Sequence, residues 1–133
     1  LVFNYMKRGF FIIITGLFLF LGGSCTKNLE DKVDGTWRRI DVTAPSSSDF
    51  EIWKFEIGNF SISKFETSTG STTLQTYGEY EVKHKKLTRR YICITKSSVE
   101  YWQANFRIRE LTKTKMVIYR DTGPLEYLEF IKQ

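Results

Sequence analysis

The stretch "EIWKFEIGNFSISKFE", residues 51–66, sets the fold class of this chain. Apolar and polar residues alternate on both sides of Gly58-Asn59, and a period of two is typical of strands with one buried face. A short glycine-containing pair between two such runs indicates a hairpin. The stretch therefore predicts strands over 51–57 and 60–66, with the turn at 58–59.

Six further runs on either side of this hairpin show the same alternation. They cover 36–42, 77–83, 86–95, 100–108, 115–120 and 125–131. The connectors are short, so consecutive strands should be antiparallel neighbours, and no segment has the pattern of a long amphipathic helix. Eight short, evenly spaced strands indicate an up-and-down barrel or a sandwich, and the lack of a long crossover favours the barrel. We predict an all-β fold, an eight-stranded antiparallel up-and-down barrel.

Alternation also assigns the two faces of each strand, because residues two apart point the same way. The predicted interior face comprises Trp53, Phe55, Ile57, Phe60, Ile62, Tyr80, Val82, Ile92, Ile94, Phe106, Ile108, Met116, Ile118, Leu128 and Phe130. The predicted outer face comprises Lys54, Glu56, Ser61, Ser63, Glu81, Arg107, Arg109, Glu126 and Glu129. In the first strand Trp37 and Arg39 share parity against Ile40 and Val42, which predicts a bulge or a barrel-end position there.

The most apolar stretch of the chain is "FFIIITGLFLFLGGSC", residues 10–25. A spanning helix needs roughly 20 apolar residues, whereas the run that ends at Leu21 has the length of a signal-peptide core. Lys7 and Arg8 precede it and small residues follow it, as in a secretory signal. We expect Met6 to be the start, after translated upstream sequence. The predicted division is 1–24 upstream residues and signal, 25–34 a lipidated tether, and 35–133 the barrel domain.

Ser24-Cys25 resembles a bacterial lipobox. That resemblance implies that Cys25 receives a diacylglycerol thioether and that its new amino terminus is acylated. Two or three acyl chains hold a soluble domain at a membrane without a spanning helix. An uncleaved signal anchor is the alternative. Residues 26–34 would extend as a tether, or Leu29 and Val33 would form a short turn that closes one end of the fold.

Composition agrees with a small exported domain. Removing residues 1–24 takes away Lys7 and Arg8 and no acid, so the formal charge falls from +5 to +3. The remaining length suits one domain and one core, and an aromatic content of 16% favours a folded chain. With Cys25 lipidated, Cys93 has no partner, so no disulfide is expected.

The order of motifs carries a second resemblance. "VDGTWRRID", 33–41, looks like the Gly-x-Trp opening of lipocalins, and "IWKFEIGNF", "YGEYEV", "FRIRELTKTKMVIYR" and "YLEFIK" follow as in bacterial lipocalin-like lipoproteins. The resemblance implies that Trp37 plugs the closed end of the barrel under a basic side chain, either Arg120 or Lys132. It also implies that the barrel binds a small apolar or amphipathic ligand.

The interior aromatic residues have two interpretations. An eight-stranded barrel is either filled by its own side chains or just wide enough for one small ligand. In the second case the cavity would open toward the 68–73 loop. Its candidate ligand-binding residues are Trp53, Phe55, Phe60, Tyr80, Phe106, Ile108, Met116 and Phe130.

Residues for catalysis are few, and we expect no enzyme, no metal site and no cofactor. His84, the one histidine, stands among lysines, and Cys93 reads as a packed thiol. The densest basic cluster is interpreted as a solubilising hairpin or a contact for anionic lipid, not as a nucleic-acid site; it comprises Lys83, Lys85, Lys86, Arg89 and Arg90.

Two functions follow from these expectations. The first is an exported lipoprotein that is anchored by its lipid to a bacterial membrane, and we expect the outer membrane. Its barrel would bind a small apolar or amphipathic ligand at the cell envelope. The second is a structural or interaction lipoprotein with a filled barrel and no ligand, which contacts envelope proteins. The size of the interior cavity discriminates between them.

Overall fold

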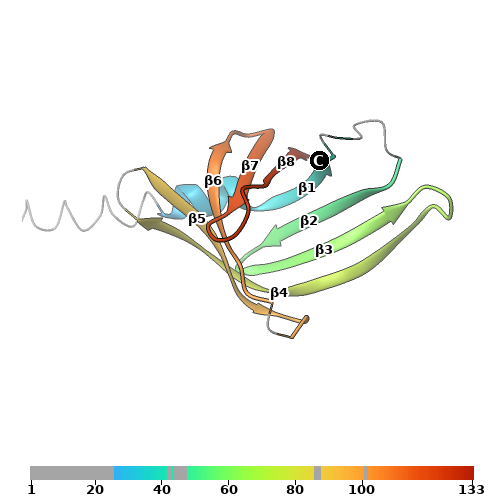
Figure 1. The fold of residues 1–133 in the computed structure, drawn as a ribbon, viewed down its shortest axis with the longest axis horizontal. Helices are drawn as coiled ribbons and strands as arrows, with labels where there is room; N and C mark the ends of the chain where they lie inside the picture. The colour runs from blue at the N-terminus through green and yellow to red at the C-terminus, as the bar shows by residue number, and fades with distance from the viewer. Residues whose placement is uncertain (1–25, 42, 44–47, 86–87, 101) are drawn as a thin grey trace, which may run out of the picture.

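The computed structural model describes residues 26–41, 43, 48–85, 88–100 and 102–133. It is a closed antiparallel barrel of eight strands that neighbour one another in sequence order, as the alternation predicts (Figure 1). The strands are β1 (Gly35–Ile40), β2 (Phe50–Glu56), β3 (Asn59–Glu66), β4 (Ser71–Lys85), β5 (Arg89–Ser97), β6 (Asn105–Leu111), β7 (Lys115–Arg120) and β8 (Tyr127–Lys132).

The first and last strands close the barrel. β1 pairs with β2 on one side and with β8 on the other, where Trp37 lies opposite Lys132. Because all pairs are antiparallel, the start of β1 and the hairpins β2–β3, β4–β5 and β6–β7 lie at one end, which we call the closed end. The connections β1–β2, β3–β4, β5–β6 and β7–β8 lie at the opposite end, which we call the mouth.

Most strand bounds lie within a few residues of the predicted ones, and the largest differences are at the starts of β4 and β6. β4 begins at Ser71 within the predicted 68–73 connector, because 71–76 continue the ladder with β3 beyond the part of β4 that pairs with β5. Threonine suits an extended strand, so this polar run does not interrupt β4. The result is the long β3–β4 hairpin on the right of Figure 1. β6 begins at Asn105 and not at residue 100, because the chain before it forms the connection from β5.

The β2–β3 turn is centred one residue earlier than predicted. Glu56 pairs with Asn59, and the two central residues, Ile57 and Gly58, have φ values of 46° and 77°. Positive φ at both central positions is the geometry of a type I′ turn. Ile57 is therefore 84% exposed and does not belong to the interior face, so its predicted inward assignment is wrong.

Apart from Ile57, the predicted interior residues face the core. All of them are buried except Leu128, which packs against the core while half-buried. Trp53 meets Phe106 and Phe130 edge to face, with ring centroids 5.6 and 5.1 Å apart. Edge-to-face contacts of this kind add to the stabilisation from apolar burial.

Residues 26–33 form a helix that packs on the closed end, so they are not an extended tether. Leu29 and Val33, four residues apart and on one helix face, are both buried in the core, whereas the charged residues between them are exposed. Of the two expectations for this segment, the one in which Leu29 and Val33 close the barrel is correct.

Several predictions fall on residues outside the described ones: the signal at 1–24, the lipidated Cys25, and the positions of Val42 and Lys86. Within the described part of the chain, no helix has the length and apolar character needed to cross a membrane.

Candidate functional site

The closed end is sealed by Trp37. Its side chain is fully buried, its indole Nε1 donates a hydrogen bond to the carbonyl oxygen of Val33 at 2.8 Å, and Nζ of Lys132 lies 5.1 Å from the ring centroid. Of the two basic candidates, Lys132 covers the tryptophan, while Arg120 ends β7 at the mouth. Gly35 has a φ of 135°, a conformation that side-chain-bearing residues rarely adopt, and a Cβ there would lie 2.6 Å from Cε of Lys132 and displace this side chain.

The mouth contains an open cavity of about 620 Å³. Its apolar lining comes from Trp53, Ile62, Phe106 and Leu128, and Trp102 and Val99 contribute from the β5–β6 connection. The polar lining comes from Arg39, Glu51, Gln75, Thr76, Arg120, Thr122 and Glu126. A concave site with an apolar floor and a few polar groups on its rim is the usual form of a small-molecule site.

The predicted ligand-binding residues divide between two levels of the barrel. Trp53 and Phe106 line the cavity. Phe55, Phe60, Tyr80, Ile108, Met116 and Phe130 are buried in the packed interior and do not line it. The lower half of the barrel is thus filled by side chains, and the open space lies above Trp53 and Phe106.

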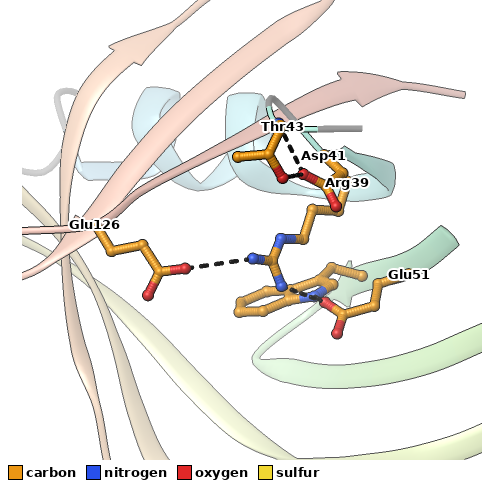
Figure 2. A network of polar contacts seen from close by, with 6 residues as sticks. Arg39, Asp41, Thr43, Glu51 and Glu126 are labelled. Atoms are coloured by element: carbon orange, nitrogen blue, oxygen red, sulfur yellow. Dashed lines mark hydrogen bonds and ion pairs between the residues drawn. The ribbon is translucent and has the colours of Figure 1, made fainter. Parts of the chain in front are cut away.

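A polar network crosses the cavity rim (Figure 2). Arg39 Nη1 lies 3.1 Å from Glu51 Oε2, and Arg39 Nη2 lies 3.7 Å from Glu126 Oε1. Glu51 Oε2 also accepts a hydrogen bond of 3.2 Å from the indole Nε1 of Trp53. Arg39 and Glu51 are half-buried, whereas the Glu126 side chain is 75% exposed, so the contact to Glu126 is the weaker of the two ion pairs.

Alternation explains why these charged residues face the cavity. Arg39 is two residues from the buried Trp37, and Glu51 is two residues from the buried Trp53. Glu126 has the parity of Leu128 and meets Arg39, so its predicted outer-face assignment is wrong. Near the mouth the inward positions reach water, and there a charged side chain no longer marks the outer face.

A wider depression of about 920 Å³ lies beside the mouth and shares Arg39, Glu51, Gln75 and Glu126 with the cavity. Outward-facing residues of β1 and β2 form part of it. The Arg38 guanidinium lies 3.8 Å from the centroid of the Phe50 ring, which stacks on Phe65. The Arg39 network therefore lines both the cavity and this outer depression.

The remaining residues with possible chemistry lie away from the mouth. His84 is exposed in the lower part of β4. Cys93 is a buried free thiol, as predicted for a packed side chain, and burial raises its pKa. The hydrogen bond with Glu81 raises the pKa of Lys83. Among the described residues, no cluster of His, Cys, Asp and Glu side chains is arranged to hold a metal ion.

Comparison with known proteins returns no relative: no protein-family profile matches the chain, and neither a curated protein nor a solved structure shows significant similarity to it. The barrel is compatible with a lipocalin-like shape, with Gly35 and Trp37 at the start of β1 and Lys132 over the indole ring.

Proposed function

We propose that this protein is a lipocalin-like lipoprotein that binds a small amphipathic molecule in the mouth of its barrel. The observation that carries the proposal is the cavity of about 620 Å³ above Trp53 and Phe106. This volume lies within the range of about 300–1,000 Å³ that small-molecule sites occupy. The apolar floor would bind an aliphatic or ring portion, and the polar rim would contact a head group.

The depth of the barrel supports a ligand that enters only part of the way. Phe55, Met116, Ile118 and Phe130 fill the section below the cavity and are almost fully buried. A ligand would have to displace these tightly packed side chains to go deeper, which is costly in a close-packed core. We therefore expect a short or compact apolar group, with its polar end at the rim.

The proposed anchor at Cys25 suits the arrangement of the two ends. The helix over 26–33 packs on the closed end, so a lipid on the preceding residue would hold the closed end toward the membrane. The β4–β5 hairpin lies at that same end, on the left of Figure 1 with the helix, and carries Lys83, Lys85, Arg89 and Arg90. Each basic residue near an anionic membrane surface contributes about 1 kcal/mol. The mouth would then face away from the lipid.

We propose binding and not catalysis, because both carboxylates of the rim, Glu51 and Glu126, are engaged with Arg39. Glu51 accepts from both Arg39 and Trp53, so its carboxylate is held as a partner of these donors and is not free to act as a base. The exposed His84 and the buried Cys93 lie outside the cavity lining. A protein-interaction lipoprotein without a ligand is the competing function.

Native mass spectrometry of the full chain, purified from its own host, tests the proposal. We expect an extra mass that leaves at moderate collision energy and that is absent from Phe106→Arg, which places a charge on the apolar floor. Ile131→Arg, an exposed strand position, is the matched control and should keep the extra mass. A wild-type protein that carries no small molecule and binds no amphiphile on titration would favour the interaction lipoprotein.

A further inference from the structure

Of the two described cations that line the cavity, Arg39 and Arg120, only Arg39 has a described carboxylate at ion-pair distance. Arg120 is the last residue of β7 and lies opposite Phe106 in the β6–β7 ladder. It shares parity with Met116 and Ile118, which are completely buried in the interior. Its side chain lines the open cavity beside Phe106 and is exposed to solvent at the mouth.

The four charged residues of the cavity lining are not paired evenly. Arg39 contacts both carboxylates, Glu51 and Glu126. Within the described part of the chain, no carboxylate lies at ion-pair distance from Arg120. The lining is neutral in sum, but both of its carboxylates lie on Arg39, which leaves the Arg120 guanidinium to contact a ligand.

We infer that the cavity binds an amphiphile with an anionic head, a carboxylate of medium chain length, with the head on Arg120 and the chain over the apolar floor. The inference rests on the proposed function. A guanidinium presents a planar set of N–H donors that matches the two oxygens of a carboxylate. Phe106 and Leu128 supply apolar surface beside Arg120 for the first methylene groups, and Trp102 and Ile62 supply it further along.

The same arrangement disfavours other head groups. A cationic head would meet the positive charge of Arg120, and like charges at short range repel. A neutral hydroxyl head would accept a single hydrogen bond from the guanidinium and would add no opposite charge, whereas a carboxylate accepts two parallel bonds and forms an ion pair. The predicted order of affinity at equal chain length is therefore carboxylate, then alcohol, then ammonium.

Three eight-carbon probes test this order on the full-length protein: octanoate, 1-octanol and octylammonium at pH 7. Trp53 and Trp102 both line the cavity, so their fluorescence reports occupancy. We expect octanoate to bind at least about tenfold more tightly than 1-octanol, a factor that corresponds to 1.4 kcal/mol. Raising the salt concentration should weaken octanoate alone.

Variants at position 120 separate a binding role from a structural one. Arg120→Gln should reduce the octanoate affinity about tenfold and leave that of 1-octanol unchanged, and Arg120→Glu should reverse the preference toward octylammonium. Arg107→Gln is the matched control, because Arg107 follows Phe106 and points to the other face, opposite Tyr119. It should leave all three affinities unchanged.

The outcomes distinguish this inference from the proposed function. Equal binding of the three probes, unaffected by Arg120→Gln, would overturn the anionic head while leaving a ligand-binding mouth. Absence of saturable binding by all three probes would overturn both. If Arg120→Gln does not fold, the order of affinity of the wild-type protein for the three probes decides whether the cavity prefers an anionic head.

Discussion

The indole Nε1–H of Trp37 donates a hydrogen bond of 2.8 Å to the carbonyl oxygen of Val33, four residues earlier in the chain. Val33 ends the helix over 26–33, and the last carbonyls of a helix have no intrahelical donor. Trp37 thus supplies the missing donor and also fills the closed end of the barrel. This single side chain ties the helix to β1.

Trp37→Ala should lower the free energy of unfolding by about 3–5 kcal/mol, the range for loss of a buried large aromatic side chain. Trp37→Phe keeps most of the packing and loses the hydrogen bond, so a smaller loss of about 1–2 kcal/mol is expected. Urea unfolding followed by circular dichroism measures both, with the half-buried Trp102→Phe as a control. Affinity of the folded fraction for octanoate should not change, because Trp37 lies at the end opposite the mouth. A loss below about 1 kcal/mol for Trp37→Ala would be the size of a surface substitution and would contradict the plug.

Tyr80 makes the stability of this barrel sensitive to alkaline pH. Its hydroxyl donates a hydrogen bond to the carboxylate of Asp34, and its ring packs edge to face on Phe55 at 4.9 Å. Burial raises the pKa of Tyr80 well above its ordinary value, and the hydrogen bond and charge of Asp34 raise it further. A folded-state pKa above the unfolded one means that the contribution is fully present below about pH 10 and is lost as the pH rises beyond it.

We therefore expect the free energy of unfolding to fall above about pH 10, by up to about 1.4 kcal/mol per pH unit from this one group. Tyr80→Phe should be less stable at pH 7 but should lose that part of the alkaline slope. Urea unfolding at pH values between 8 and 11.5 measures how the free energy of unfolding depends on pH. Both proteins carry Cys93→Ala, because burial raises the pKa of the Cys93 thiol as well and its titration would add to the slope. Tyr77→Phe, at an exposed position of the same strand, is the matched control. If Tyr80→Phe and Tyr77→Phe have the same slope, the Tyr80–Asp34 contact does not control the alkaline response.

The strand order and the interior face were predictable because they depend on local signals. Short connectors force antiparallel neighbours, and period two separates Trp53 and Phe55 from Lys54 and Glu56. The same rule fails at Ile57, where the alternation continues into the turn. Because β-branched residues rarely adopt positive φ, nothing in the composition marks Ile57 as a turn residue.

The candidate site was harder to predict, because two of its parts lack a distinctive pattern. Arg39, Glu51 and Arg120 occupy inward positions at strand ends, where the inner wall reaches water and charge no longer distinguishes the faces. Each of the three lies two residues along its strand from a buried residue, namely Trp37, Trp53 and Ile118, so the alternation rule would have placed it on the inner face. Trp102 lies in the β5–β6 connection, outside any periodic run, and only the folded chain places it against Phe60, with ring centroids 6.0 Å apart.

Cys25→Ser should abolish fatty-acid labelling of the protein. The reason is the lipobox-like Ser24-Cys25 after a short apolar run, since the thioether requires the cysteine sulfur. Metabolic labelling with a fatty-acid analogue in the native host measures it, and Cys93→Ser controls for acylation at the other cysteine. Undiminished labelling of Cys25→Ser would remove the lipoprotein from the proposed function.

Ile57→Asn should raise the stability of the barrel, although it removes an apolar side chain. Ile57 has a φ of 46° and is 84% exposed, so it contributes little burial and bears the cost of a left-handed conformation. That conformation costs an ordinary L-residue roughly 1–2 kcal/mol, whereas asparagine adopts it more readily and is preferred beside glycine in type I′ turns. A gain of about 1 kcal/mol in the free energy of unfolding is expected from relief of this cost. Ile131→Asn, an exposed position inside β8, lacks the strained backbone and should give no gain. Urea unfolding of the two variants beside the wild type measures the difference, and equal losses at both positions would show that the turn is not strained.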